Sequence, residues 1–231
     1  MRNIHFFLDF DGTISTGDVV DLVLERFADK RWKDVEKEWA EGQIGSRECL
    51  RRQIELVKAS PEDLQKLVSH VRLDPHFLAF LKKAEDLGVL VTIVSDGFDL
   101  LIEQVLRQNV HDRQWIVKGI PIFSNKLRKT GKGFEAVFPT DPCEHGCANC
   151  KAAVMRKLVA VDDNVFFVGD GWSDRFAAEK AHLTFAKGRL LAFCRDNGLE
   201  NIEYVDFGKI TQWLDDNHSF LRKVQVADGR R

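Results

Sequence analysis

The chain has 231 residues, of which 44% are hydrophobic and 30% are charged. This mixture is ordinary for a globular protein and excludes a disordered or collagen-like chain. The 34 lysine and arginine residues are balanced by 36 aspartate and glutamate residues, which gives a net charge of −2. Because there is no basic surplus, we expect neither nucleic acid nor an anionic membrane as a partner.

Membrane spans and secretion signals are not expected either. The apolar run from Leu87 to Val94 falls far short of the ~20 residues that a bilayer-spanning helix needs. The first residues lack the basic, apolar and small-residue order of a signal peptide, so we expect a cytoplasmic location.

The first predicted elements are a strand and a long helical block. Ile4–Leu8 is a short apolar run that ends at Asp9, which is typical of a buried strand. From Asp18 to Val71 apolar residues recur at helical spacing. Within this block Ser60 precedes a proline and two acidic residues, a pattern that indicates a helix start. We therefore predict an all-helical insertion after the first strand.

Strands and helices alternate in the rest of the chain. The apolar runs Val89–Val94 and Val165–Val168 predict two more buried strands, and turn residues between Ile116 and Phe138 predict a small antiparallel hairpin. The other expected elements are helices over Pro75–Leu87, Phe98–Gln108 and Lys151–Val159, a helix capped by Ser173 that runs to Lys180, a short strand near Phe185, a helix from Leu190, a last helix over Phe207–Asn217 and a frayed tail after Ser219.

This alternation predicts an α/β fold with a doubly wound, mostly parallel sheet. We expect residues 1–15 and 75–217 to form the core, residues 16–74 to form a helical cap, and residues 218–231 to form a flexible tail. In sheets of this kind ligands bind outside the carboxyl ends of the strands.

Polar residues gather where the predicted strands end. Asp9 and Asp11 follow the first strand, Ser95 follows the second, and Asp170 and Asp174 follow the third. Carboxylates that lie close together repel one another unless a cation joins them, and Mg²⁺ takes carboxylate, carbonyl and phosphate oxygens as ligands. We therefore expect a Mg²⁺ site at this edge of the sheet.

Four motifs occur in the order of the haloacid dehalogenase superfamily. They are Asp9-x-Asp11-Gly12-Thr13, Ser95 after an apolar strand, Lys151 at the start of a helix, and Gly169-Asp170-Gly171-x-x-Asp174. The chain thus resembles this superfamily over residues 9–174, and its helical block resembles the cap of the phosphoserine-phosphatase-type branch, subfamily IB. The resemblance implies a Rossmann-like core with a small all-helical cap. It also implies a Mg²⁺-dependent phosphatase for a small phosphorylated metabolite.

The resemblance also implies a role for each motif residue. Asp9 would be the nucleophile that forms an aspartyl-phosphate, and Asp11 would protonate the leaving group and then activate water. Thr13 would orient Asp11, Ser95 would bond a phosphoryl oxygen, and Lys151 would neutralise phosphoryl charge. The Mg²⁺ ligands implied in this way are Asp9, the backbone carbonyl of Asp11, Asp170 and, in support, Asp174.

Branches of the superfamily imply different substrates. Phosphoserine phosphatases hold the substrate amine and carboxylate with a glutamate and an arginine, where this chain has Asp18 and Gln53. The phosphatases of methionine salvage, which act on 2-hydroxy-3-keto-5-methylthiopentenyl-1-phosphate, resemble this chain in a cysteine-rich stretch before the motif lysine. Phosphoethanolamine/phosphocholine phosphatases carry cysteines there too. The candidate substrate-binding residues are Asp18, Arg51, Gln53, Asp96 and Gly97.

The cysteine-rich stretch ends at the motif lysine. Cys143, His145, Cys147 and Cys150 offer the ligand types of a tetrahedral Zn²⁺ site. Redox-active thiols, a single disulfide and ordinary packing are the other interpretations that the spacing leaves open.

The sequence leaves other function classes open as well. A phospho-accepting signalling protein also uses an acidic cluster and a phosphorylated aspartate, although such domains run to about 120 residues and lack a helical cap. A phosphotransferase whose cap excludes water would use the same motifs. For any of these, we expect a monomer or a homodimer.

Overall fold

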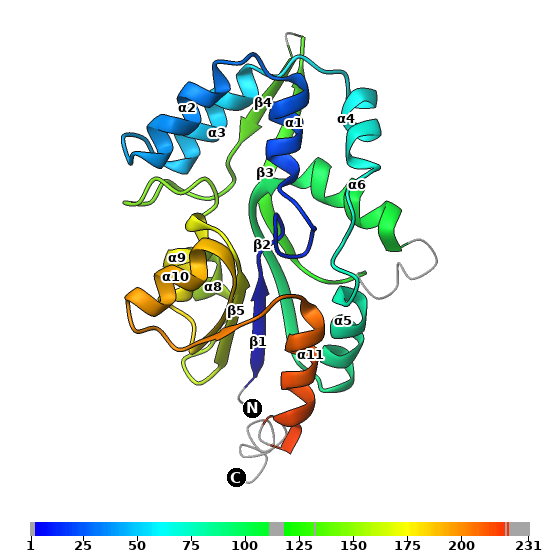
Figure 1. The fold of residues 1–231 in the computed structure, drawn as a ribbon, viewed down its shortest axis with the longest axis vertical. Coiled ribbons are helices and arrows are strands. Elements are labelled where there is room, and N and C mark those ends of the chain that lie inside the picture. Colours follow the sequence, from blue (N-terminus) through cyan, green and yellow to red (C-terminus); the bar gives the residue numbers. More distant parts are fainter. Residues whose placement is uncertain (1–2, 111–117, 132, 220, 222–231) are drawn as a thin grey trace.

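The computed structural model describes residues 3–110, 118–131, 133–219 and 221, which form an α/β fold around a seven-stranded sheet (Figure 1). The strand order is β4-β3-β2-β1-β5-β6-β7. Neighbouring strands pair in parallel except β3 and β4, which form an antiparallel hairpin. The strands are β1 (Ile4–Leu8), β2 (Leu90–Phe98), β3 (Ile122–Thr130), β4 (Gly133–Val137), β5 (Asn164–Gly169), β6 (Leu183–Ala186) and β7 (Asn201–Glu203).

Strand β1 lies in the middle of the sheet, between β2 and β5, and all of its residues are buried. Because side chains alternate across a strand, Phe6 packs into the apolar cluster on one face and Phe7 into the cluster on the other. An apolar run that is buried on both faces is the pattern of a central parallel strand. The carboxyl end of β1 therefore opens at the middle of one sheet edge.

Helices cover both faces of the sheet (Figure 1). One face packs against α5 (Phe77–Asp86), α6 (Asp99–Val110) and α11 (Phe207–Asp216). The other face packs against α8 (Lys151–Leu158), α9 (Arg175–Ala178) and α10 (Gly188–Asp196). This arrangement leaves the carboxyl edge of the parallel strands free to carry a site.

The segment between β1 and α5 forms a layer of helices at the top of the molecule in Figure 1. Asp18 caps the first helix, because its carboxylate accepts the backbone N–H of Asp21 at 2.9 Å. The two connections to the core run side by side, with an antiparallel bridge between Ser15 and Leu73. The helices are α1 (Val19–Phe27), α2 (Trp32–Ala40), α3 (Ser46–Glu55) and α4 (Pro61–Val68).

The β3–β4 hairpin extends the sheet toward this helical layer, and β4 packs against α3 (Figure 1). The helical layer is therefore held by the hairpin as well as by its two chain connections. The sequence predicted a hairpin within residues 116–138, and the described residues confirm it. Residues 116, 117 and 132 of that range lie outside the described residues.

The predicted fold class and the predicted strands β1, β2 and β5 are confirmed. Three details differ. Strand β2 continues through Phe98, the short strand β7 was not predicted, and Ser173 lies inside a 3₁₀ turn (Trp172–Asp174) and does not cap a helix. Residues 220 and 222–231 of the predicted tail lie outside the described residues.

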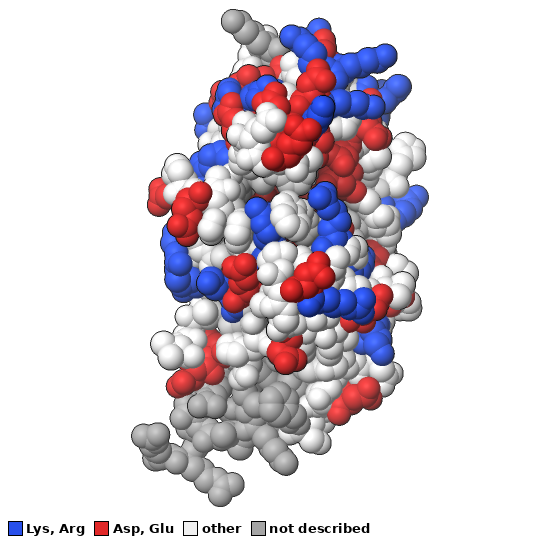
Figure 2. Space-filling model, turned by 60° about the vertical axis from the view of Figure 1, so that its left-hand side comes forward, with Lys and Arg blue, Asp and Glu red and all other residues white. Residues whose placement is uncertain are grey.

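The surface agrees with the balanced composition. Figure 2 shows lysine and arginine side chains interspersed with aspartate and glutamate over the viewed face. Within the part of the chain that the structure describes, no helix is long and apolar enough to cross a membrane.

Candidate active site

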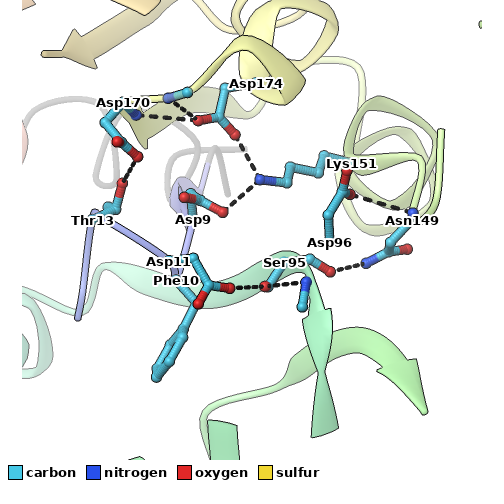
Figure 3. Close-up of polar contacts among 12 residues, drawn as sticks. Asp9, Phe10, Asp11, Thr13, Ser95, Asp96, Asn149, Lys151, Asp170 and Asp174 are labelled. Carbon is cyan, nitrogen blue, oxygen red and sulfur yellow. Dashed lines mark hydrogen bonds and ion pairs between the residues drawn. The ribbon is translucent and has the colours of Figure 1, made fainter. Parts of the chain in front are cut away.

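The carboxyl ends of β1, β2 and β5 bring together residues that are far apart in the sequence (Figure 3). Asp9 follows β1, Ser95 lies near the end of β2, and Asp170 follows β5. Lys151 enters the same site from the first position of α8. The sequence analysis expected these side chains to gather where the parallel strands end, and they do lie together there.

Lys151 is buried between two carboxylates (Figure 3). Its Nζ atom donates to Oδ1 of Asp9 at 2.5 Å and to Oδ1 of Asp174 at 2.6 Å. Burial alone would lower the pKa of Lys151, but the carboxylates of Asp174 and Asp9 raise this pKa well above its ordinary value. The amine is therefore a fixed positive charge next to Asp9.

Asp174 positions the loop that follows β5. Its Oδ2 atom accepts the backbone N–H groups of Asp170 at 3.1 Å and Gly171 at 3.0 Å. Both carboxylate oxygens of Asp174 therefore accept hydrogen bonds from the protein: Oδ2 from this loop and Oδ1 from Lys151. This arrangement fixes the backbone of Asp170 beside Asp9 and Lys151.

The structure corrects one predicted role. The Thr13 hydroxyl donates to Oδ1 of Asp170 at 3.0 Å, so the prediction that Thr13 orients Asp11 is wrong. The reason is the turn at Gly12, whose φ of +73° is a conformation that favours glycine. A Cβ atom at Gly12 would also lie 2.6 Å from Oδ2 of Asp170, so the turn brings the β1 loop directly against the β5 loop.

The Asp11 carboxyl group lies on the cap side of Asp9. Its Oδ1 atom accepts the backbone N–H of Val19 at 2.9 Å, and its Oδ2 atom accepts the Ser95 hydroxyl at 3.3 Å. Burial, and after it the charge of Asp18, raises the pKa of Asp11 to about 8. The group is therefore protonated at neutral pH, the form that a general acid requires.

Three carboxylates form a set of hard oxygen donors. One oxygen from each of Asp9, Asp170 and Asp174 lies within 4.8 Å of the others. Mg²⁺ prefers carboxylate oxygens at 2.0–2.1 Å, so this donor set suits that ion. The side chain of Asp11 is not part of this set.

A cavity of ≈ 270 Å³ lies between the helical layer and the sheet edge. Asp9, Asp11, Lys151 and Asp170 line its core end. Of the candidate substrate-binding residues, Asp18, Gln53, Asp96 and Gly97 also line it.

Of the candidate substrate-binding residues, Arg51 lies outside the cavity. Its side chain is on the exposed face of α3, where it pairs with Glu48 at 2.7 Å and Glu55 at 2.6 Å. The cavity lining does not include it. Gln53, two positions later on the helix, points the other way and is buried.

Two acidic residues of the cavity were not predicted from the sequence. Asp21 of α1 and Glu36 of α2 line its cap end, together with Asp18. Gln53 donates to Oε2 of Glu36 at 2.9 Å. Burial, and after it the charges of Asp18 and Glu36, raises the pKa of Asp21 to about 7.

The cysteine-rich stretch lies next to this cavity. The Sγ atoms of Cys143, Cys147 and Cys150 lie within 4.8 Å of one another. His145 is not part of this group, because its ring stacks on Phe176 at a centroid distance of 3.8 Å. The three cysteines are free thiols.

Known proteins resemble the chain over most of its length. The bifunctional enzyme MtnB/MtnX of Bacillus licheniformis is 29% identical over 94% of the chain, and the chain spans 50% of that protein. The 2-hydroxy-3-keto-5-methylthiopentenyl-1-phosphate phosphatase of an Exiguobacterium species is 24% identical over 91% of the chain and 96% of that protein. A solved structure described as a phospho-aspartyl intermediate analogue of phosphoserine phosphatase has a TM-score of 0.69 at 22% identity, over 92% of the chain and 99% of that structure.

A comparison of the chain with sequence models of whole protein families identifies its family. The sequence model of haloacid dehalogenase-like hydrolases matches residues 6–179, which include all four motifs and the helical insertion. The resemblance that the motifs indicated is therefore confirmed, and the chain belongs to the haloacid dehalogenase-like hydrolases.

Proposed function

We propose that this hydrolase is a Mg²⁺-dependent phosphatase that cleaves the phosphomonoester of a small metabolite through an aspartyl-phosphate on Asp9. The observation that carries the proposal is the Lys151 amine, which is buried 2.5 Å from Asp9 at the bottom of a cavity that Asp11 also lines. A carboxylate nucleophile held by a fixed cation, beside a second carboxyl group that can carry a proton, meets the needs of a two-step phosphoryl transfer.

In the first step a carboxylate oxygen of Asp9 attacks phosphorus, and the bond between phosphorus and the leaving oxygen breaks. Asp11 gives its proton to that oxygen, so the leaving group departs as an alcohol. In the second step Asp11, now ionised, takes a proton from a water molecule that attacks phosphorus. The bond between phosphorus and Asp9 breaks, and phosphate is released.

Asp9 and Asp170 are the residues that we propose to hold Mg²⁺, with Asp174 in support. Both oxygens of Asp174 accept protein hydrogen bonds, so its part is to fix the backbone of the Asp170 loop and to orient Lys151. When bound, Mg²⁺ would offset the charge of the phosphoryl group and of the carboxylates around it.

The relatives suggest one substrate for this proposal. The name of the Exiguobacterium relative states activity on 2-hydroxy-3-keto-5-methylthiopentenyl-1-phosphate, and that protein matches 91% of the chain. We propose this intermediate of methionine salvage as the first substrate to test.

The charge of the cavity favours a second candidate, a phosphorylated amine. Asp18, Asp21 and Glu36 line the cap end of the cavity, where the leaving group would lie if the phosphoryl group is held at Asp9. The amide of Gln53 contacts Glu36 but brings no charge. A cationic leaving group would gain from these carboxylates.

The experiment is phosphate release from matched pairs of esters, with and without Mg²⁺. Phosphocholine is compared with 3,3-dimethylbutyl phosphate, which has the same shape without the charge, and both are compared with phosphoserine and the salvage intermediate. A preference for phosphocholine over its neutral analogue of tenfold or more, reduced in Glu36→Gln, supports the amine. Faster turnover of the salvage intermediate than of either member of the pair supports the first candidate.

The same experiment distinguishes the other function classes. If no ester releases phosphate but Asp9 becomes stably phosphorylated, the chain is a phospho-accepting protein. If the ester is cleaved only when a second alcohol is added, and that alcohol becomes phosphorylated in place of phosphate release, the chain is a phosphotransferase. Either result would contradict the proposed hydrolysis.

A further inference from the structure

The strongest unassigned cluster of side chains lies outside the catalytic carboxylates. The thiol sulfurs of Cys143, Cys147 and Cys150 lie within 4.8 Å of one another. The backbone N–H of Cys147 points at Sγ of Cys143, with a distance of 3.4 Å between nitrogen and sulfur. Hydrogen bonds from backbone amides to sulfur stabilise the thiolate form, which is the form that binds a metal ion.

The spacing of the three sulfurs suits one soft cation. Zn²⁺ binds thiolates at about 2.3 Å in a tetrahedral arrangement, which places the sulfurs about 3.8 Å apart. Small side-chain movements would bring the three sulfurs to that separation. Mg²⁺ prefers oxygen ligands, so this cluster and the carboxylates of the active site select different ions. Cys143 and Cys147 are partly exposed, so water can reach a fourth position.

The loop that carries the cysteines holds its shape without regular secondary structure. Residues 138–150 contain no helix or strand. Connections longer than about 12 residues without regular structure are uncommon in compact domains unless something else fixes them. A metal ion that joins three points of the loop would supply that constraint, since metal binding contributes directly to folding.

The helical cap rests on this same loop. The backbone N–H of Arg47, in α3, donates to the carbonyl oxygen of Gly146 at 3.0 Å. The Arg47 guanidinium group donates to the carbonyl oxygens of Thr140 at 2.6 Å and Cys147 at 3.3 Å. The contact is close, because a Cβ atom at Gly45 would lie 2.5 Å from the Gly146 carbonyl oxygen.

The other end of the loop reaches the active site. Asn149 donates to the carbonyl oxygens of Ser95 at 3.0 Å and Phe123 at 2.8 Å. Cys150 is the residue before Lys151 and stands at the N-cap position of α8. The conformation of this one loop therefore affects both the contacts that hold the helical cap and the position of Lys151.

We propose that Cys143, Cys147 and Cys150 bind one Zn²⁺ ion, and that this ion fixes the loop on which the cap rests. His145 is not a ligand, because its ring is stacked on Phe176 and lies outside the sulfur group. The site is separate from the proposed Mg²⁺ site, so it can be tested without any measurement of phosphatase activity.

The test begins with the metal content of the full chain. Protein produced in zinc-supplemented medium and purified under reducing conditions is analysed by mass spectrometry for bound zinc. We expect about one zinc per chain. After removal of zinc and addition of Co²⁺, we expect the intense ultraviolet charge-transfer absorption of cobalt–thiolate bonds.

The variants Cys143→Ser and Cys147→Ser should each weaken zinc binding by more than about 100-fold, beyond the usual effect of an outer-shell change. His145→Asn is the matched control in the same loop and should bind zinc as the unchanged chain does. Hydrogen exchange at the Arg47 amide should become faster when a chelator removes the zinc, because the Gly146 carbonyl that it bonds would lose its fixed position.

Three results would overturn the proposal. The unchanged chain could bind zinc no more tightly than Cys143→Ser. His145→Asn could lose zinc to the same degree as the cysteine variants. Two of the three cysteines could be joined in a disulfide after reducing purification, which would leave too few thiolates to bind zinc. If a cysteine variant does not fold, the cobalt spectrum of the unchanged chain decides, since a missing thiolate band contradicts the site.

Discussion

At the residue scale, the active site depends on a few buried charges whose partners come from distant parts of the sequence. Lys151 contacts Asp9 and Asp174 while all three are buried. Removing one member of such a group leaves the others as buried charges without compensation, which is strongly destabilising. Substitutions of Lys151 would therefore mix losses of stability and activity, and Asp11 gives a cleaner test of mechanism.

Asp11→Asn should separate the two chemical steps. An amide cannot give a proton to the leaving oxygen or take one from water, and general acid–base catalysis contributes about 10²–10⁴-fold. With an alkyl phosphate, turnover should fall by a factor in that range. With p-nitrophenyl phosphate, whose leaving group needs no proton, the variant should release a rapid burst of nitrophenol followed by slow turnover.

Rapid-mixing measurements of nitrophenol release give the size of the burst. Its amplitude should approach one equivalent per enzyme chain. Turnover of both esters at the unchanged rate, with no burst, would show that Asp11 has neither role. Ser69→Ala, an exposed change outside the cavity, serves as the control and should leave both rates unaltered.

His5 should make the stability of the fold depend on pH. Burial lowers the pKa of His5 to about 4, against a weaker opposing effect of Asp163. The unfolded chain, with a histidine pKa near 6.5, binds a proton that the folded chain does not. Stability is therefore full above about pH 6.5 and is lost as the pH falls toward 4, by up to about 3 kcal/mol.

Urea denaturation of the unchanged chain and of His5→Gln at a series of pH values measures this effect. The glutamine keeps a polar group for the Thr92 hydroxyl, which lies 2.8 Å from Nε2 of His5. The difference in the free energy of unfolding between the two proteins should narrow as the pH falls from 6.5 to 4. A difference that stays constant over this range would exclude His5 as the cause.

At the scale of elements, short sequence patterns predicted where helices and strands begin and end better than they predicted which face of a helix is buried. The Ser60 cap and the breaks at the ends of β1 and β5 depend on neighbours in the sequence. Which face of α3 is buried depends on its packing against α2 and β4, which lie elsewhere in the sequence. For this reason the sequence alone could not show that Gln53 lines the cavity and that Arg51 does not.

Ser60→Ala tests the start of α4. The Ser60 hydroxyl accepts the backbone N–H of Asp63 at 3.1 Å, and the Asp63 carboxylate accepts the backbone N–H of Ser60 at 3.0 Å. Loss of such a cap costs about 1 kcal/mol. We expect that loss in the free energy of unfolding in urea, with phosphate release unchanged because α4 does not line the cavity.

Ser69→Ala, at the other end of the same helix, is the matched control. The Ser69 hydroxyl bonds a carbonyl oxygen on an exposed surface, so its loss should change stability by less than about 0.5 kcal/mol. Equal effects of the two substitutions would mean that the capping hydrogen bonds do not stabilise α4.

At the scale of the whole molecule, the sequence predicted the core of the site because parallel strands deliver their carboxyl ends to one edge. Asp9, Ser95 and Asp170 were found in this way, and Lys151 followed from the motif order. The gathering of strand ends at one edge is a property of the fold class, so the location of the site can be deduced before any contact between residues is known.

The cap end of the cavity could not be predicted in the same way. Asp21 and Glu36 meet there because α1 and α2 fold over the sheet edge, and nothing in their local sequence indicates that contact. The hydrogen-bond partner of Thr13 was missed for a related reason. The turn at Gly12 brings the loop after β1 against the loop after β5, and Thr13 and Asp170, which form the hydrogen bond, are 157 residues apart in the sequence. Long-range packing decides both cases.

The most direct test of the proposed function is identification of the phosphorylated residue. The protein is mixed with p-nitrophenyl phosphate and Mg²⁺, quenched in acid, and reduced with borohydride, which converts an aspartyl-phosphate into homoserine. We expect peptide mass spectrometry to find homoserine at position 9, only with Mg²⁺, and at its highest level in Asp11→Asn. Turnover of substrate with no modification at Asp9, or with modification at another residue, would contradict the proposed function.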